Sequence, residues 1–349
     1  MNFPKLTTLF FATVAMMAAI SCDKEDDTEV MPSLNGALTF DVSEFVSPGQ
    51  TVTMKPEGLR HPDDKGLGYY WKVTPGMSKA DTVRLENGLS PDGQESDGEF
   101  SYTFPDSLGT FTVGCYGFAY GYSTSYVAKK VTVVKGGLEQ SITNTGILPR
   151  DPSINFNDIR YYYVNHSGTD WFRNNLADPS AGAPYVNAPA MSNVFGRYYS
   201  YEEAMNACPE GWTLPSNADW VALAKAINPD TEITETGIIP DVVSGLMADI
   251  EFNSVKMWEY WPAVGDITDK AKFAAIPAGY ANLGSKEDGR YPTASFFGSY
   301  EYSVFWTSDK VEDEEGMAYY RYFISDQPDL LIGKGDMKTF GASVRCIRK

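Results

Sequence analysis

The four cysteines of this 349-residue chain are its most reactive side chains. A thiolate can carry a lipid, bind a metal, attack a substrate or form a disulfide. Cys22 stands apart, because it follows an apolar run from Leu6 to Ile20 and precedes an acidic stretch that reaches Asp27. The remaining cysteines are Cys115, Cys208 and Cys346. At most one intramolecular disulfide can form among these three.

The start of the chain has the order of an export signal over residues 1–21, with Lys5 before the apolar run. This run is shorter than the roughly 20 residues that cross a bilayer comfortably. Its end, Ala19 to Ser21, resembles a bacterial lipobox, although most lipoboxes carry leucine at the position of Ala19. The resemblance implies that Cys22 is lipidated. Ordinary cleavage that leaves a free thiol, and an uncleaved membrane anchor, are the alternatives.

Residues 22–35 are acidic and polar, and we interpret them as a tether. An acidic stretch directly after the lipidated cysteine resembles the tag that sends Bacteroides-type lipoproteins to the outer face of the outer membrane. The resemblance implies a lipid-anchored outer-membrane protein that faces the extracellular side. A solvated spacer is the other interpretation of the same residues.

The composition argues against several classes of function. Asp and Glu number 46 against 28 Lys and Arg, so a formal charge of -18 makes nucleic acid a poor partner. The only histidines, His61 and His166, have neither the spacing of a zinc site nor a place in a nucleophile elbow. We therefore expect no enzyme and no cofactor. Paired carboxylates of a hydrolase leave no trace in sequence, so that alternative stays open.

Residues 36–135 predict a β-sandwich, because short alternating runs are separated by Pro and Gly turns. The expected strands lie at 51–54, 69–73, 81–85, 99–104, 110–116 and 126–134. The runs at 47–53, 70–73 and 100–113 resemble the polycystic-kidney-disease-type immunoglobulin-like domains of bacterial surface proteins. In that comparison Trp71, Phe111 and Val113 point into the core, and Cys115 shares their parity as a buried thiol.

Residues 136–150 read as a linker, and residues 151–349 form a second, α+β domain. Ser200 and Glu203 make a capping box for a helix that runs to Cys208. A second box at Ser216 begins a helix that reaches Ile227, with Trp220 on its core face.

The segment from Gly196 to Trp220 resembles the Fibrobacter succinogenes major paralogous domain, with supporting pieces from Trp171 to Ile347 in the family's order. The family is thought to share the C-type-lectin-like fold. In that fold a cysteine at the end of the first helix bridges to one in the final strand, so the resemblance implies a Cys208–Cys346 disulfide. Two free thiols are the competing interpretation.

The tripeptide Gln327-Pro-Asp329 resembles the sugar-selecting motif of calcium-dependent C-type lectins. Its partner tripeptide, Trp-Asn-Asp, does not follow, so Gln327 and Asp329 are weak candidates for calcium, and no metal is expected. The acidic run 312–315 is better explained as a solvated loop.

We expect a surface-exposed binding or adhesion module for a glycan or an extracellular protein. The irregular stretch 228–302 would supply variable recognition loops. Its aromatic residues are candidate platforms for sugar rings, although core burial is the other fate of such side chains. These candidates are Trp258, Tyr260, Trp261 and Tyr291. An accessory or tip subunit of a surface fimbria, and a carbohydrate-active hydrolase, are the alternatives.

Overall fold

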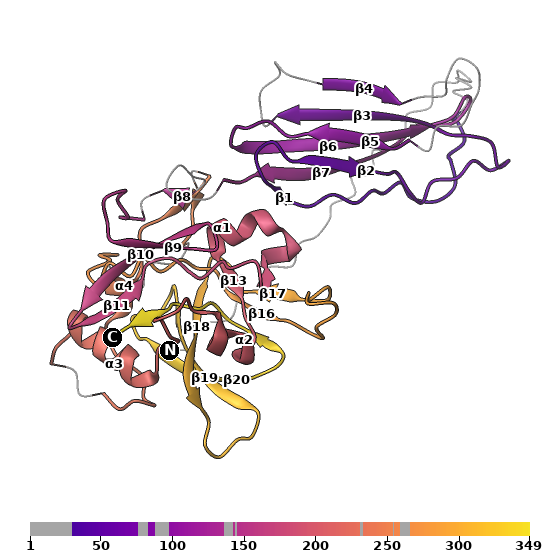
Figure 1. The fold of residues 1–349 in the computed structure, drawn as a ribbon. Helices are drawn as coiled ribbons and strands as arrows, with labels where there is room; N and C mark the ends of the chain where they lie inside the picture. The colour runs from indigo at the N-terminus through magenta and orange to yellow at the C-terminus, as the bar shows by residue number, and fades with distance from the viewer. Residues whose placement is uncertain are drawn as a thin grey trace, which may run out of the picture.

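The computed structural model describes most of the chain and shows a β-rich protein with several sheets (Figure 1). The described residues are 30–75, 83–87, 98–135, 142–143, 145–230, 233–253, 255–258 and 266–349, with backbone only at 83–87 and 142–143. The predicted export signal, Cys22, most of the tether, Tyr260 and Trp261 lie outside them. We refer to residues 30–135 as the sandwich and to residues 142–349 as the C-terminal domain.

The sandwich consists of two sheets. Its strands are β1 (Phe45–Val46), β2 (Thr51–Met54), β3 (Gly68–Pro75), β4 (Val83–Asn87), β5 (Phe100–Thr103), β6 (Gly109–Phe118) and β7 (Ser125–Val133). The larger sheet has the order β1-β7-β6-β3-β4, and β2 pairs with β5 in the smaller one. β1 joins β7 in parallel, whereas the other pairs of this sheet are antiparallel.

Alternation along the strands sends one set of side chains into a core between the two sheets. Trp71 lies at its centre, where its ring packs against Phe40 and Phe100 and its indole nitrogen donates to the Gly98 carbonyl at 2.8 Å. The four residues predicted to lie in this core are buried: Trp71, Phe111, Val113 and Cys115. Burial also raises the pKa of the Cys115 thiol to about 12, so Cys115 is a structural residue.

The C-terminal domain is built from short strands and a few helices. Its strands are β8 (Ile142–Thr143), β9 (Ser153–Phe156), β10 (Ile159–His166), β11 (Thr169–Phe172), β12 (Ala183–Pro184), β13 (Arg197–Tyr198), β14 (Glu251–Phe252), β15 (Val255–Lys256), β16 (Tyr280–Asn282), β17 (Ser295–Phe297), β18 (Tyr302–Lys310), β19 (Met317–Ile324), β20 (Leu331–Asp336), β21 (Phe340–Gly341) and β22 (Ile347–Arg348). Its helices are η1 (Tyr185–Asn187), η2 (Pro189–Met191), α1 (Ser192–Phe195), α2 (Tyr201–Ala207), α3 (Asn217–Ile227) and α4 (Val243–Leu246). The sheet orders are β22-β11-β10-β9, β18-β19-β20, β17-β16-β21, β15-β14-β8 and β12-β13.

Capping boxes begin the two longest helices at the predicted residues. Ser200 accepts from the backbone of Glu203, whose carboxylate accepts from the Ser200 backbone in return. Ser216 and Asp219 repeat this exchange at α3. The core position predicted for Trp220 is confirmed, because this ring is fully buried. α2 ends one residue before Cys208, which takes an extended conformation.

The stretch 228–302, which we expected to supply variable recognition loops, is buried over much of its described length. This stretch supplies a large part of the main core, with buried residues that include Ile239, Val242, Val243, Leu246, Met247, Ile250, Met257 and Phe273. An irregular backbone can be buried when other segments satisfy its polar groups. Ile239 exchanges backbone hydrogen bonds with Leu330, and Ala275 donates to the Leu246 carbonyl.

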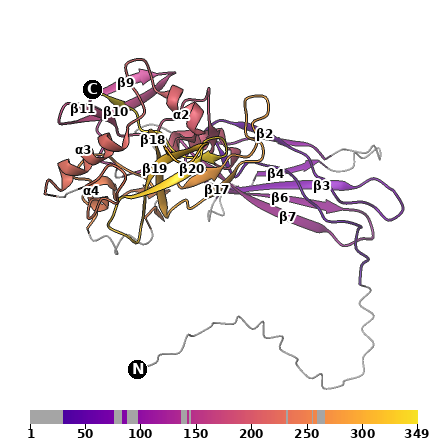
Figure 2. The ribbon, with the colours of Figure 1, turned by 90° about the horizontal axis from the view of Figure 1, so that it is seen from below.

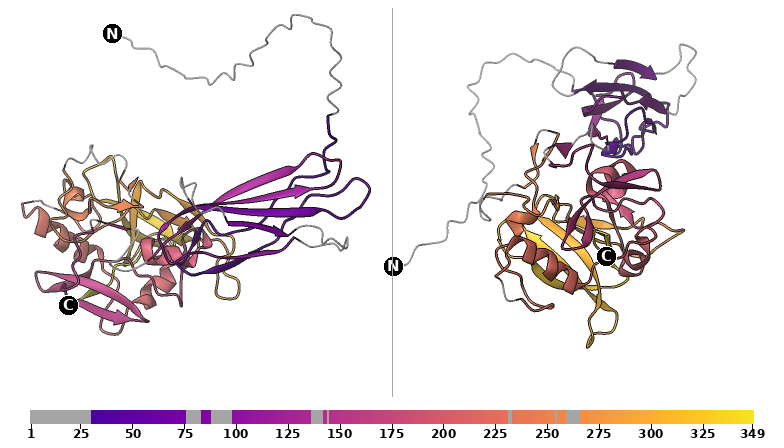
Figure 3. Two further views of the ribbon diagram at one scale, coloured as in Figure 1. Left: turned by 90° about the horizontal axis from the view of Figure 1, so that it is seen from above. Right: turned by 60° about the vertical axis from the view of Figure 1, so that its left-hand side comes forward.

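The sandwich and the C-terminal domain are in contact through β1 and the end of β7. The Phe45 ring lies 6.2 Å from that of Tyr185 and 6.4 Å from that of Phe252. Val134, just after β7, is buried in the main core of the C-terminal domain. Residues 142–143, inside the predicted linker, pair with β14. The connection is therefore partly built into the C-terminal domain, and the sandwich extends away from it (Figures 2 and 3).

Candidate functional site

An open groove of about 820 Å³ lies beside α2 in the C-terminal domain. We call it the α2 groove. Most of its lining residues have polar side chains, and they come from five separate stretches of chain. The lining residues are Phe156, Asp178, Ser180, Ala181, Ser200, Glu202, Glu203, Asn206, Ala207, Gly284, Ser285, Lys286, Tyr291, Lys338 and Thr339.

Glu203 is the most constrained carboxylate of the α2 groove. Its side chain accepts from Lys286 at 2.6 Å, from the Ser200 backbone at 3.1 Å and from Tyr291. Burial alone would raise the pKa of Glu203, but these hydrogen bonds outweigh it and the pKa lies below its ordinary value. Burial and the neighbouring Glu203 raise the pKa of Tyr291 to about 12, so its hydroxyl stays a donor.

A second carboxylate, Asp178, lies on another wall and is buried. It accepts from the Ser180 backbone at 3.1 Å and from the Ser180 hydroxyl at 2.6 Å. Lys338 and Thr339 come from a tight turn in which Asp336 accepts both of their backbone N–H groups. These hydrogen bonds hold the turn that carries the two lining residues, and they also lower the pKa of Asp336.

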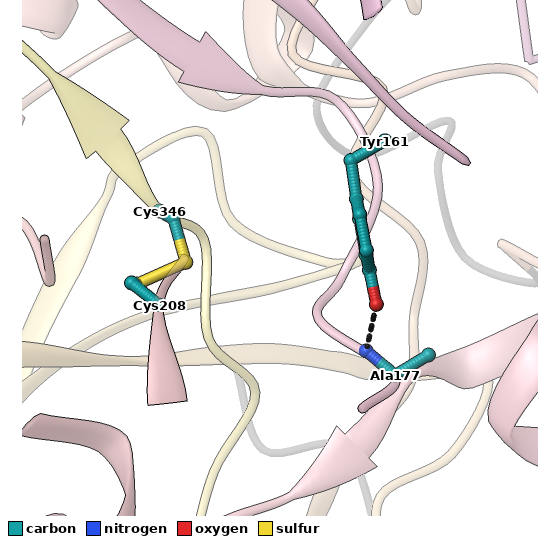
Figure 4. The surroundings of a disulfide bond; sticks show 4 residues. All are labelled: Tyr161, Ala177, Cys208 and Cys346. Atoms are coloured by element: carbon teal, nitrogen blue, oxygen red, sulfur yellow. Dashed lines mark hydrogen bonds between the residues drawn. A yellow bond between two sulfur atoms is a disulfide. The ribbon is translucent and has the colours of Figure 1, made fainter. Parts of the chain in front are cut away.

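A disulfide holds the wall that α2 provides. Cys208, directly after α2, is bonded to Cys346, with 5.8 Å between the two Cα atoms (Figure 4). This is the pair that the sequence resemblance implies. Nearby, the Tyr161 hydroxyl accepts from the Ala177 backbone at 3.1 Å, just before Asp178 (Figure 4). The bond closes a separation of 138 residues, worth about 5 kcal/mol in the chain-entropy account.

The groove offers hydrogen-bonding groups of every type at fixed positions. Carboxylates and hydroxyls accept, lysines and the Asn206 amide donate, and the Phe156 ring provides an apolar surface. Cysteine and histidine are both missing from the described residues that line it. In the part of the chain that the structure describes, no group of three His, Cys, Asp or Glu side chains converges as metal ligands would.

The candidate aromatic platforms lie in different environments. Trp258 is 1% exposed and stacks on Phe323 at 5.8 Å, so it is a core residue and cannot face a ligand. It is buried because the whole stretch before it folds inward. Tyr291 lies at the α2 groove, where its hydroxyl meets Glu203. Tyr260 and Trp261 lie outside the described residues.

The Gln327-Pro-Asp329 turn is used inside the fold. The Pro328 carbonyl accepts from the backbones of Val242 and Val243, and the Asp329 carboxylate accepts from the Asp241 backbone at 3.1 Å. The turn thus anchors the start of α4, whereas Gln327 is exposed. Asp329 thus has a structural partner in the Asp241 backbone.

Most residues of the α2 groove were not predicted from sequence. Ser200 and Glu203 were recognised only as a capping box, although the same carboxylate faces the groove. Lys286 and Lys338 come from irregular turns far apart in the chain, and no local pattern marks their convergence. The one usable signal was a capping glutamate on a helix that the family motif already singled out.

The described part of the chain contains no helix with the length and apolar character of a membrane span. Both histidines have structural partners. His61 packs against Tyr122, with 4.7 Å between ring centroids, and the His166 ring donates to the Ala271 carbonyl at 2.7 Å.

Comparisons with known proteins give one family and weak structural similarities. Among curated proteins, none matches this chain. A superoxide reductase (neelaredoxin) from Ignicoccus hospitalis is similar at 12% identity, covering 29% of this chain and 82% of that chain with a TM-score of 0.24. A variant of that protein has 14% identity, coverages of 28% and 81%, and a TM-score of 0.22. TM-scores of this size do not establish a shared fold.

The family model of the Fibrobacter succinogenes major domain matches residues 155–348, which is more than half of the chain. The match includes α2, α3, both disulfide cysteines and every residue that lines the α2 groove. It agrees with the family that the sequence motifs predict. The chain therefore belongs to the Fibrobacter succinogenes major domain family.

Proposed function

We propose that this protein is a lipid-anchored outer-membrane lipoprotein that binds glycans in the α2 groove on the extracellular side of the cell. The observation that carries the proposal is the fixed polar wall around Glu203, Lys286 and Tyr291. A sugar presents alternating hydroxyl donors and acceptors, and prearranged partners avoid the entropic cost of ordering side chains on binding. An extracellular protein with a polar loop is the other partner of this chemistry.

The state of the carboxylates favours binding over hydrolysis. A glycosidase needs one carboxylic acid with a raised pKa to protonate the leaving group. The pKa of Glu203 is lowered, and its oxygens are engaged by Lys286 and Ser200. Both carboxylate oxygens of Asp178 likewise accept hydrogen bonds from Ser180. These carboxylates are suited to accept hydrogen bonds.

The finer architecture belongs to the same proposal. An immunoglobulin-like sandwich is supported by the parallel β1–β7 pair and the central Trp71. A C-type-lectin-like C-terminal domain is supported by the disulfide from the end of α2 to the start of β22. The lipid anchor rests on the lipobox-like residues before Cys22, and the outer-membrane location rests on the acidic stretch after it.

An array of glycans and mucins, probed with the mature chain carrying Cys22→Ser, tests the binding function. We expect dose-dependent capture that is equal with calcium and with chelator, since the described residues present no metal cluster. Asn206→Trp places a bulky ring at the groove wall from an exposed position and should reduce capture at least about tenfold. Glu210→Trp makes a similar change on an exposed residue that does not line the groove.

The two variants separate the groove from the rest of the surface. Capture that Asn206→Trp leaves unchanged would move the site elsewhere. An array without signal, together with a protein partner recovered from the cell surface, would instead support the accessory-subunit alternative.

A further inference from the structure

One end of the sandwich exposes a group of large apolar and aromatic side chains. Val30 is 90% exposed, Met31 60%, Tyr120 102% and Tyr126 53%. The other large exposed hydrophobic side chains of the described residues are distributed along the rest of the chain. Single exposed apolar residues need no explanation, whereas a contiguous group marks a surface for interaction. We call these four residues the tyrosine tip.

Hydrogen bonds join two of the chain segments that carry the tyrosine tip. The Ser123 backbone donates to the Pro32 carbonyl at 2.9 Å, and Ser33 and Ser123 form a parallel bridge. The start of the described chain therefore lies along the β6–β7 turn that carries Tyr120. Tyr126, the second residue of β7, pairs with Tyr116, with 4.3 Å between the ring centroids.

Tyr126 lies flat on the sheet. A Cβ added to Gly114 would approach atoms of the Tyr126 ring to 2.9–3.3 Å, so the ring covers the bare backbone of this glycine. One face of the ring is thus supported, and the ring is still half exposed. A flat, supported tyrosine offers contact area without a further loss of side-chain freedom.

The position of the tyrosine tip is fixed by the direction of β7. The strand begins at the tip and ends at Val133, next to Val134 in the core of the C-terminal domain. Its nine residues span about 30 Å. The tip therefore lies at the end of the sandwich that is remote from the C-terminal domain, where the first described residues join it (Figures 2 and 3).

Charges of both signs occur around the tip. Asp63 and Lys65, from the loop before β3, form an exposed ion pair at 3.6 Å. The tether directly before Val30 is acidic, with five carboxylates and one lysine between Asp23 and Glu29. The case for a membrane contact therefore rests on the side chains of the tip, because tyrosine with apolar neighbours is the composition that settles at a membrane–water interface.

We propose that the tyrosine tip docks into the headgroup region of the phospholipid membrane that holds the lipid anchor. This inference rests on the proposed lipidation of Cys22. Seven residues separate Cys22 from Val30, so even a fully extended chain keeps Val30 within about 30 Å of the anchor. A tether of this length gives an effective concentration in the millimolar range, at which weak contacts are occupied.

Docking has a consequence for the α2 groove. The groove belongs to the C-terminal domain, about one sandwich length from the tip. With the tip on the membrane, the sandwich becomes an oriented support rather than a freely tumbling spacer. The groove is then held away from the lipid surface, toward partners outside the cell.

Sedimentation with vesicles of phosphatidylethanolamine and phosphatidylglycerol tests the docking without the lipid anchor. The protein is the mature chain with Cys22→Ser, which cannot be lipidated. We expect weak, saturable binding that Tyr120→Ser with Tyr126→Ser reduces about tenfold or more. The matched control is Ile238→Ser with Val255→Ser, which removes two exposed apolar side chains from the C-terminal domain.

A fluorescent label reports which end touches the lipid. Thr124 and Glu210 are exposed, and Cys115 is buried, so Thr124→Cys and Glu210→Cys can be labelled selectively in the Cys22→Ser chain. Vesicles should shift the emission of a polarity-sensitive dye to the blue at position 124 and leave position 210 unchanged.

Three outcomes would overturn the proposal: vesicle binding that the tyrosine substitutions leave intact, a blue shift at both positions, or no binding at millimolar lipid. Self-association or glycan capture that depends on Tyr120, without vesicle binding, would also overturn it. Mass analysis of the native N-terminus tests the lipidation of Cys22 separately, and the array with Asn206→Trp tests the groove separately. The three results are therefore distinguishable.

Discussion

Buried backbone polar groups find their hydrogen-bond partners in different ways in the sandwich and in the C-terminal domain. In the sandwich, long ladders between β3, β6 and β7 pair the backbone, so apolar side chains can fill the core. In the C-terminal domain much of the core backbone is irregular, and buried arginines donate to its carbonyl groups. In this domain, charged donors in the core therefore complement the backbone hydrogen bonds that satisfy the irregular segments.

Arg345 shows this most directly. Its guanidinium donates to the Asn175 side chain at 2.6 Å and to the carbonyls of Phe172, Phe273 and Ala274 at 2.6–3.1 Å. It also lies over the Phe273 ring, 4.5 Å from the centroid. Burial lowers the pKa of Arg345 to about 9, opposed by the nearby Asp269, so the side chain stays charged at neutral pH.

Arg321 has the same role at another irregular stretch. It donates to the Asn217 side chain at 3.0 Å, to the Gly237 carbonyl at 2.7 Å and to the Glu235 carbonyl. The segment before α4 is thereby fastened to β19. No arginine is buried among the described residues of the sandwich, which follows from its regular pairing.

The largest effect is expected from Arg345→Met. This change leaves several buried carbonyls and the Asn175 amide without their donor, at a cost of about 3–5 kcal/mol in the free energy of unfolding. Urea titration followed by tryptophan fluorescence measures the loss. Arg290→Met, at an exposed turn, is the control and should change stability by less than about 0.5 kcal/mol. Equal stability of the two variants would refute the role given to buried arginines.

Replacing the disulfide by two serines should destabilise the C-terminal domain by about 3 kcal/mol, since the typical effect of a disulfide is smaller than the roughly 5 kcal/mol of the chain-entropy account. Hydrogen exchange read by mass spectrometry resolves the two regions. Peptides of α2 and β11 should exchange faster, while those of β3 and β6 keep their protection. Faster exchange throughout the sandwich would mean that the two regions unfold together.

Trp71→Phe gives the corresponding measurement in the sandwich. It removes the hydrogen bond to the Gly98 carbonyl and part of the ring, so we expect a loss of about 2 kcal/mol. The reactivity of Cys115 toward a thiol reagent checks it, because this buried thiol becomes accessible only when the sandwich opens. An unchanged rate of modification would contradict the central position of Trp71.

The two regions also differ in what sequence could predict. The core positions predicted for Trp71, Phe111 and Cys115 are confirmed, and that of Cys115 followed from its place in the strand, because side chains alternate between the two faces of a regular strand. The capping boxes likewise located α2 and α3. The stretch 228–302 was misjudged, because its burial depends on donors such as Arg321 that lie far away in the chain. The α2 groove was not predicted for the same reason, because its lining residues come together only when distant parts of the chain fold.

The smallest effect concerns the α2 groove itself. Lys286→Met removes the ion pair with Glu203, whose lysine is 45% exposed, so the loss of stability near neutral pH should stay below about 1 kcal/mol. The folded-state pKa of Glu203 is lowered, so the ion pair contributes above the ordinary pKa of a glutamate and is lost as pH falls through the folded value. The difference between the native chain and Lys286→Met should therefore vanish in acid. The measurement is hydrogen exchange of α2 as a function of pH. The control is Lys310→Met, an exposed substitution that does not line the groove, and its difference in exchange from the native chain should not depend on pH. A gap that persists in acid would show that Lys286 acts through packing on Tyr291, whose ring centroid lies 5.6 Å from its ammonium, and not through the charge of Glu203.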